Sequence, residues 1–288
     1  MKRKLVSVVI PTYNCDGLIN DCLTSVKKQT YKPVEIIIVD SFSTDNTAKI
    51  AKKFGKVYSY GKDPRRKDIF AAPFQRNYGV TKAKGDYVYW IDSDMRLKPN
   101  VIQDCVTNIE RQKADAIIVP EVSIGDSFWA ECRALEKECY NSSIRSYTDA
   151  ARFIKRSVWR KLGGLDASLG GMDDFDFQAR LDKANFKTIK SKSSIYHYEG
   201  RLSLSKQIIK KFIYGKTASG YFRKYRNHRL HLAKQYLRPE FFSHLDILSK
   251  RPIHTLGMVV MKIVENTAAL TGLIYSAMVK DEVKIYKS

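Results

Sequence analysis

The sequence lacks the features that would assign it to several common classes of protein. Its five cysteines form no CxxC pair and no histidines cluster beside them, which disfavours a zinc site and predicts free thiols in a reducing compartment. No apolar run reaches the roughly eighteen residues of a membrane-spanning helix, so none is expected. The basic N-terminus leads directly into a strand-like pattern, without the apolar segment of a signal peptide. No GxGxxG follows that pattern, which disfavours a dinucleotide-dependent oxidoreductase.

Acidic residues are missing from one long stretch of the chain. Between Lys206 and Arg238 there are ten Lys or Arg residues and no Asp or Glu, in a protein with a formal net charge of +21. Such a stretch is expected to attract an anionic surface, which is either lipid headgroups or nucleic acid. The alternative is a lysine-rich surface that only keeps the protein soluble.

The first two-thirds of the chain alternate between short apolar runs and stretches with helical spacing. The spacing predicts strands at 6–11, 34–40, 56–60, 86–92 and 116–122, and helices at 16–29, 44–54 and 76–84. Continuous Val/Ile runs are typical of strands that helices cover on both faces, so we expect an α/β fold with a mainly parallel sheet. Ligands of such sheets bind beyond the carboxyl ends of the strands.

Acidic residues stand at two of these strand ends and after a glycine-rich stretch. Asp40 closes the second strand, Asp92-Ser93-Asp94 closes the fourth, and Asp173-Asp174-Phe175-Asp176 follows 163–171. Residues i and i+2 of an extended chain point to the same side, so Asp92 and Asp94 can face one ligand. Their carboxylates suit Mg²⁺ or Mn²⁺, which neutralises a diphosphate leaving group. The pattern therefore predicts a divalent metal site after the fourth strand.

Six short motifs occur in order along the first 200 residues. They are Val8–Asn14, Glu35–Asp40 with Ser43–Thr47, Arg76–Gly79, Ala83–Asp86, Trp90–Asp94, and Gly164–Asp166 with Asp173–Leu181. In this order and spacing they resemble glycosyltransferase family 2. The resemblance implies a Rossmann-like GT-A catalytic domain at 1–200, followed by a basic, amphipathic helical extension at 201–288. It also implies transfer of a sugar from a UDP- or GDP-sugar, with inversion. The Gln-x-x-Arg-Trp signature of processive synthases is absent, so we expect a single sugar to be transferred.

The resemblance assigns nucleotide contacts residue by residue. The expected contacts are Pro11, Thr12, Tyr13, Asn14, Asp40, Arg76, Asp92, Ser93 and Asp173. Asp40 is expected to accept the ring N–H that uracil and guanine both offer, so it does not choose between them. Arg76 is expected beside the donor diphosphate, with a structural ion pair as the alternative. Where relatives often have Asp-Gly, this chain has Ser41-Phe42, so the nucleotide preference stays open.

The resemblance also assigns the metal and the catalytic base. Asp94 is expected to be the principal ligand of Mn²⁺ or Mg²⁺ and His197 a further metal or phosphate contact, although a histidine satisfied in the core is the alternative. Asp174 matches the general base that takes the proton of an acceptor hydroxyl, unless the acceptor is itself a phosphate. The family's pair usually begins with Glu, where this chain has Asp173. Asp173 and Asp176 are alternatively helix caps.

After about residue 200 the pattern is helical. The range 256–279 carries Lys262, Glu265, Ser276 and Lys280 opposite one apolar stripe. The stripe consists of Leu256, Val259, Val260, Ile263, Val264, Leu270, Ile274, Ala277 and Met278. We expect it to enter a membrane interface beside the basic stretch, with the protein peripheral on the cytoplasmic face. The acceptor is then a lipid-linked or glycan molecule, and the resemblance to membrane-attached relatives favours GDP-mannose as the donor. The alternative is that the stripe packs on protein.

Two rival functions come from other classes. A nucleic-acid-binding protein would use the basic stretch, with Tyr214, Tyr221, Phe222 and Tyr225 as stacking platforms. A nucleic-acid-binding function would not explain the aspartates at the strand ends, so nucleic acid is not an expected partner. An inactive scaffold of the same fold is the second rival, and the acids expected to bind the metal and to act as the base argue against it.

Overall fold

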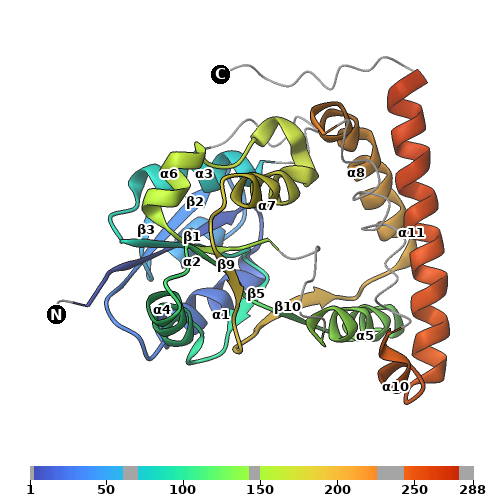
Figure 1. Ribbon diagram of the computed structural model, residues 1–288, viewed down its shortest axis with the longest axis horizontal. Coiled ribbons are helices and arrows are strands. Elements are labelled where there is room, and N and C mark those ends of the chain that lie inside the picture. The colour runs from blue at the N-terminus through green and yellow to red at the C-terminus, as the bar shows by residue number, and fades with distance from the viewer. Residues whose placement is uncertain (1–2, 61–70, 143–149, 226–242, 279–288) are drawn as a thin grey trace. The chain divides into compact units, whose positions relative to one another are not determined.

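The computed structural model describes residues 3–60, 71–142, 150–225 and 243–278, and these divide into two compact units (Figure 1). The sheet unit comprises Met1–Glu121, Asp149–Ala167 and Phe177–His197. The helical unit comprises Val122–Thr148, Ser168–Asp176 and Tyr198–Ser288. The division therefore differs from a single boundary at residue 200, because the acidic segment after the glycine-rich stretch groups with the C-terminal helices.

The sheet unit is built on a seven-stranded sheet with the order β3-β2-β1-β4-β8-β6-β9. Its strands are β1 (Val6–Thr12), β2 (Val34–Asp40), β3 (Lys56–Ser59), β4 (Tyr87–Trp90), β6 (Ala116–Ile118), β8 (Phe153–Lys155) and β9 (Thr188–Lys190). Only β8 runs antiparallel to its neighbours in the paired registers. The mainly parallel α/β sheet expected from the Val/Ile runs is confirmed.

Helices cover both faces of this sheet (Figure 1). They are α1 (Asp16–Lys27), α2 (Thr47–Ala51), α3 (Ala72–Lys82), α4 (Val101–Arg111), α6 (Arg156–Leu162) and α7 (Asp173–Lys183). Along β1, Val8 and Ile10 join the core cluster under α1 and α4, whereas Val9 joins the cluster under α3 and α6. Successive side chains of a strand point to opposite faces, which explains why the strand carries no polar alternation.

The fifth expected strand, 116–122, is two strands in the structure. Pro120 has no N–H to donate, and it ends β6. The chain resumes as β7 (Glu121–Gly125), which belongs to a separate three-stranded sheet with β5 (Met95–Leu97) and β10 (Ile195–Gly200), in the order β5-β10-β7. In this sheet His197 pairs with Met95. The small sheet thus brings residue 197 beside the end of the Asp92-Ser93-Asp94 motif.

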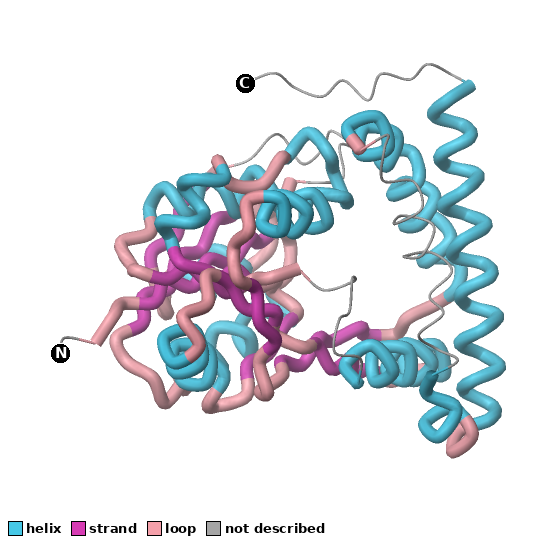
Figure 2. Tube along the Cα trace, viewed as in Figure 1, coloured by secondary structure: helices cyan, strands magenta, loops and turns pink. Residues whose placement is uncertain are grey.

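The described part of the helical unit contains long helices, one short helix and a 3-10 segment. They are α5 (Phe128–Ser142), α8 (Leu204–Lys224), the short α10 (Leu245–Leu248) and α11 (Pro252–Met278), with the 3-10 segment η1 at Ala167–Met172. Figure 2 shows α8 and α11 side by side. Their backbones approach where glycine faces the partner: a Cβ on Gly215 would lie 1.9 Å from the carbonyl oxygen of Ala269, and one on Gly272 2.0 Å from that of Phe212. Small residues allow this approach.

Helix α11 turns its charged side inward and its apolar side outward. Its exposed large apolar side chains are Ile253, Leu256, Val259, Val260, Ile263, Leu270, Ile274, Tyr275 and Met278. These exposed side chains do not pack on the described part of the same chain, whereas packing on another subunit, the other form of the alternative, is not tested. By length and composition α11 is a candidate membrane-spanning helix, which the sequence analysis did not foresee; that no helix spans a membrane stays a prediction. Residues 226–238 of the basic stretch and Lys280 lie outside the described residues.

Charged side chains fill the centre of the helical unit. Arg133 of α5 pairs with both Glu136 and Glu265, and the Lys262 ammonium lies 2.6 Å from Glu136 and 2.8 Å from Glu265. Lys211 of α8 lies 4.0 Å from Glu265. Burial alone would raise the pKa of Glu265, but the three cations lower it. This group, called the buried ion cluster below, joins α5, α8 and α11.

Candidate active site

Asp40 organises the loops after β1 and β2. The side chain is 3% exposed, its Oδ1 accepts hydrogen bonds from Thr12 Oγ1 at 2.9 Å and Ser43 Oγ at 2.6 Å, and its Oδ2 accepts from the Ser43 N–H at 2.9 Å. Gln75 of α3 donates to the carbonyls of Thr12 and Val39 at 3.0 and 2.6 Å. A carboxylate oxygen has two lone pairs, so Oδ2 has capacity for a base N–H as well.

The same loops bind each other through Asn14. Its backbone N–H donates to Ser43 Oγ at 2.9 Å, and its Oδ1 accepts the Thr44 N–H at 2.9 Å. Asn14 and Phe42 have positive φ angles of 41° and 57°, a region that Asn tolerates better than Phe. The Phe42 and Tyr13 side chains are 51% and 45% exposed. The expected nucleotide residues Pro11–Asn14 and Asp40 thus lie together at the carboxyl ends of β1 and β2, and their contact with a nucleotide stays a prediction.

Asp92 is held by two arginines. Its Oδ1 lies 2.6 Å from Arg76 of α3 and its Oδ2 lies 2.9 Å from Arg152, which precedes β8. Burial would raise the pKa of Asp92, but the two guanidinium groups hold it well below its usual range. The ion pair that was the alternative for Arg76 is present in the structure. The contacts of Arg76, Asp92 and Ser93 with the donor stay predictions.

Asp94 and His197 are brought together, as the resemblance implied. His197 Nε2 lies 3.3 Å from Asp94 Oδ2, and its Nδ1 lies 3.1 Å from Oε2 of Glu121, the first residue of β7. Burial would lower the pKa of His197, but the hydrogen bonds to Asp94 and Glu121 raise it to about 10. The imidazole therefore lies between two carboxylates that satisfy both of its nitrogens, and its contact with a metal or phosphate stays a prediction.

The residues at this point fit a divalent metal shared with a substrate. Asp94 Oδ1 is buried and has no hydrogen-bond partner. In the part of the chain that the structure describes, no three His, Cys, Asp or Glu side chains form a complete ligand set. Mg²⁺ is usually held by one or two carboxylates together with substrate phosphates, so a two-residue site suits it, and Mn²⁺ takes a similar oxygen-rich shell.

The acidic segment at the start of α7 belongs to the helical unit, whereas Asp94 belongs to the sheet unit. Asp176 is fully buried, and its Oδ1 lies 2.7 Å from Lys224 Nζ and accepts a hydrogen bond from the Tyr225 hydroxyl at 2.8 Å. Both partners stand at the C-terminal end of α8. Two positions earlier, Asp174 is half-buried in the first turn of α7. The end of α8 therefore anchors the segment that carries the expected base.

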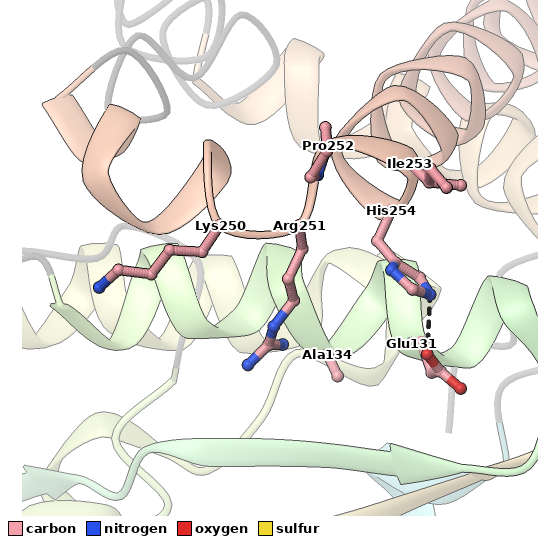
Figure 3. Close-up of a pocket in the computed structure, with 7 residues that line it drawn as sticks. All are labelled: Glu131, Ala134, Lys250, Arg251, Pro252, Ile253 and His254. Carbon is pink, nitrogen blue, oxygen red and sulfur yellow. Dashed lines mark ion pairs between the residues drawn. The ribbon is translucent and has the colours of Figure 1, made fainter.

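A surface pocket in the helical unit contains none of the expected site residues (Figure 3). Figure 3 shows it between α5 and the start of α11, and it is lined by Glu131, Ala134, Lys250, Arg251, Pro252, Ile253 and His254. His254 Nε2 lies 2.7 Å from Glu131. The five cysteines are free thiols, as predicted, and Cys132 and Cys139 pack in the apolar cluster of α5.

Sequence reasoning missed four residues of the site: Ser43, Gln75, Arg152 and Glu121. Ser43 begins the motif Ser43–Thr47 but was given no role, and in the structure it donates two hydrogen bonds to Asp40. Gln75 donates to the carbonyls of Thr12 and Val39, a role that had no sequence signal. Arg152 and Glu121 had no signal, because neither lies in a motif and each finds its partners only through tertiary contacts.

Comparison with known proteins identifies the family. Residues 7–162, more than half of the chain, match the model of Glycosyl transferase family 2. The glycosyltransferase GlyG of Streptococcus pneumoniae is 34% identical over 115 residues, which cover 40% of this chain and 38% of GlyG. The chain thus matches well under half the length of this curated relative.

Solved structures show the fold. The mannosyltransferase PcManGT from Pyrobaculum calidifontis, in complex with GDP-Man and Mn²⁺, has a TM-score of 0.61 and 18% identity, covering 99% of this chain and 89% of its own. TarS 1-349 of S. aureus, in complex with UDP-GlcNAc, has a TM-score of 0.54 and 16% identity, covering 96% and 92%. The chain belongs to glycosyl transferase family 2 and has a GT-A fold.

Proposed function

We propose that this glycosyltransferase transfers a single sugar from a UDP- or GDP-sugar, with inversion and with Mn²⁺ or Mg²⁺. The observation that carries the proposal is the Asp94–His197 pair, with its unpaired buried carboxylate oxygen after β4. A divalent metal held there would neutralise the charge that develops on the leaving diphosphate. PcManGT and TarS, solved with GDP-Man and UDP-GlcNAc, support a nucleotide-sugar donor.

The donor base is proposed to bind at the loops after β1 and β2. Asp40 would accept the ring N–H on its Oδ2, because Thr12 and Ser43 already fix its orientation. The exposed rings of Tyr13 and Phe42 offer flat apolar surfaces for the base. GDP-mannose is our first choice of donor, since PcManGT covers 99% of this chain and was solved with GDP-Man.

Asp174 is proposed to be the general base. An acceptor hydroxyl is a weak nucleophile, and a carboxylate within hydrogen-bond reach takes its proton as the oxygen attacks the anomeric carbon. Attack in line with the departing diphosphate inverts the anomeric configuration. The support is positional: Asp174 follows Asp173 at the start of α7, and the Asp176 anchor to α8 holds that turn in place.

The acceptor is proposed to be lipid-linked or a glycan, and the protein to lie peripherally on the cytoplasmic face of a membrane. The exposed apolar side of α11 supports this, because a surface helix normally turns that side toward the core. Cations lie beside it: Lys216 of α8 is 4.9 Å from the ring of the exposed Tyr275, and Lys206 and Lys210 are exposed. Anionic headgroups complement such a rim.

Nucleic acid is a weaker partner for the same surface. Of the aromatic residues suggested as stacking platforms, Tyr221 is 3% exposed, and the Tyr225 ring lies 4.7 Å from it. Tyr225 also donates its hydroxyl proton to Asp176. These two rings are used inside the helical unit, so they offer no stacking face for bases.

Calorimetric titration with UDP, GDP and their sugars, with and without Mn²⁺, tests the proposal. The wild type is expected to bind one nucleotide in a metal-dependent way, and Asp94→Ala to lose that dependence. Asp115→Asn is the control, because its carboxylate pairs with Lys155 at 3.0 Å, away from the site. No binding of any nucleotide at millimolar concentration would contradict the proposed donor and metal.

A further inference from the structure

A chain of alternating charges runs through the proposed metal site. Arg152 joins two carboxylates, with one nitrogen 2.9 Å from Asp92 Oδ2 and the other 3.2 Å from Glu121 Oε1. Glu121 then contacts His197, and His197 contacts Asp94. All five residues belong to the sheet unit. Of these, Glu121 and Arg152 have no role in the function proposed above.

Glu121 is a buried carboxylate whose two oxygens have different partners. The side chain is 8% exposed, Oε1 faces Arg152 and Oε2 faces Nδ1 of His197. Leaving an ionised carboxylate at such a position is costly unless it is paired and hydrogen-bonded. Arg152 supplies the pairing charge, so the remaining oxygen is fixed as a hydrogen-bond acceptor for the imidazole.

The hydrogen bond to Glu121 decides which nitrogen of His197 is free. In a neutral imidazole one nitrogen donates and the other accepts. A cation that binds at Nε2 would displace the Nε2 proton, and with Nδ1–H still donating to Glu121 the lone pair of Nε2 then points to the side where Asp94 Oδ2 lies, 3.3 Å away. Histidines that bind metals commonly donate their second N–H to a carboxylate, which fixes the tautomer and the ring orientation.

We infer that Glu121 is a positioning residue, which orients His197 so that its Nε2 and the Asp94 carboxylate together hold the divalent cation of the donor complex. The inference rests on the proposed function. It also divides the roles within Asp92-Ser93-Asp94: Asp92 is committed to Arg76 and Arg152, and through Arg152 it supports Glu121, whereas Asp94 keeps a free oxygen.

The test measures Mn²⁺ affinity by electron paramagnetic resonance of the free ion, with saturating UDP or GDP, on wild type, Glu121→Ala, Glu121→Gln and His197→Ala. Loss of an outer-sphere carboxylate typically weakens metal binding by about 10- to 100-fold, which we expect for Glu121→Ala. Glu121→Gln keeps an acceptor for Nδ1–H and is expected to recover part of the affinity. Asp115→Asn, an ion-paired carboxylate outside the chain of charges, is expected to bind as wild type does.

A double-mutant cycle separates positioning from a general structural effect. If Glu121 acts through His197, then Glu121→Ala/His197→Ala binds Mn²⁺ no more weakly than His197→Ala alone. Additive losses in the double variant overturn the inference, as does an unchanged affinity in Glu121→Ala while the wild type binds. A wild type that binds no Mn²⁺ with either nucleotide overturns the proposed function instead. Should Glu121→Ala fail to fold, Glu121→Gln carries the same cycle, with a smaller expected loss.

Discussion

The two units of this protein bury opposite kinds of side chain. In the sheet unit Val8, Val9 and Ile10 are fully buried, and charged residues gather at the strand ends. In the helical unit Glu265 is 1% exposed, whereas Ile253 is 72% and Met278 79% exposed. The sheet unit follows the rule for a protein in water. The helical unit exposes a row of large apolar side chains along α11, and we propose a membrane as the partner of this surface.

In both units, charged side chains are buried together with partners of opposite charge, which offset the free-energy cost of removing them from water. The buried ion cluster pairs Arg133 and Lys262 with Glu136 and Glu265, and a similar arrangement of Arg76 and Arg152 holds Asp92 in the sheet unit. In the sheet unit the pairs support a ligand site. In the helical unit they occupy the side of α11 that an apolar core would normally cover.

Removing one member of the buried ion cluster should have the largest effect. Glu265→Ala leaves Glu136 as the carboxylate that Arg133 and Lys262 share, so the buried cluster has an excess of positive charge, and loss of one side of a buried pair costs about 3–5 kcal/mol of unfolding free energy. Denaturant unfolding followed by circular dichroism measures it. Asp21→Ala, which breaks the exposed pair with Arg96, is the control and should cost about 0–1 kcal/mol.

The pH dependence of unfolding gives the same cluster a second test. Because the pKa of Glu265 is lowered in the folded state, the unfolded state binds more protons in acid. Its stabilisation is therefore complete above the ordinary value of 4.5 and is lost as the pH falls below it. An equal loss of stability in Glu265→Ala over that range would contradict the assignment.

Placing a charge on the outer side of α11 should break the proposed membrane contact. Ile263 is 61% exposed, and burying an isoleucine in an apolar environment is worth about 1.5–3 kcal/mol. Ile263→Glu is expected to weaken binding to anionic vesicles by roughly tenfold or more, with little change in stability. Co-sedimentation with vesicles of anionic and neutral lipid measures it.

The control for that experiment is Leu245→Glu, an equally exposed leucine in α10 outside the stripe. It should bind vesicles as the wild type does. If wild type ignores vesicles but binds nucleic acid in a salt-dependent way, the membrane proposal is wrong and the rival partner gains support.

Separating α8 from α11 should have a moderate effect. A Cβ on Gly272 would lie 2.0 Å from the carbonyl oxygen of Phe212, so Gly272→Ala forces the helices apart at a cost of about 1–3 kcal/mol. Gly17→Ala in α1 meets no atom within 4 Å and should stabilise the protein slightly, as alanine does in a helix. Thermal unfolding of the two variants should move in opposite directions.

Loosening the anchor of the acidic segment should have the smallest effect. Lys224→Met removes the ion pair to Asp176 and is expected to lower kcat by about tenfold, because a displaced base transfers protons less well. Donor affinity should not change, since the expected donor residues other than Asp173 lie in the sheet unit. Lys210→Met, an exposed lysine of the same helix, removes the same charge without touching Asp176. Equal kcat in both variants would contradict the anchoring role.

Much of the sheet unit was predictable from the sequence. Apolar runs located β1, β2 and β4, and the motif order led to the family and to Asp94 with His197 as partners. The antiparallel β8 and the split at Pro120 were not predicted, because strand direction and sheet membership depend on pairing between distant residues. Glu121 and Arg152 were missed for the same reason: both act through ion pairs with residues far away in the chain.

The sequence by itself determined the alternation of elements, the acids at the strand ends and the two-sided character of α11, since each follows from local periodicity. Only the tertiary structure decided which side of α11 faces outward, that the end of α8 anchors Asp176, and that Glu121 contacts Nδ1 of His197. Each depends on which partner occupies a face, and local spacing carries no information about a partner that is distant in the chain.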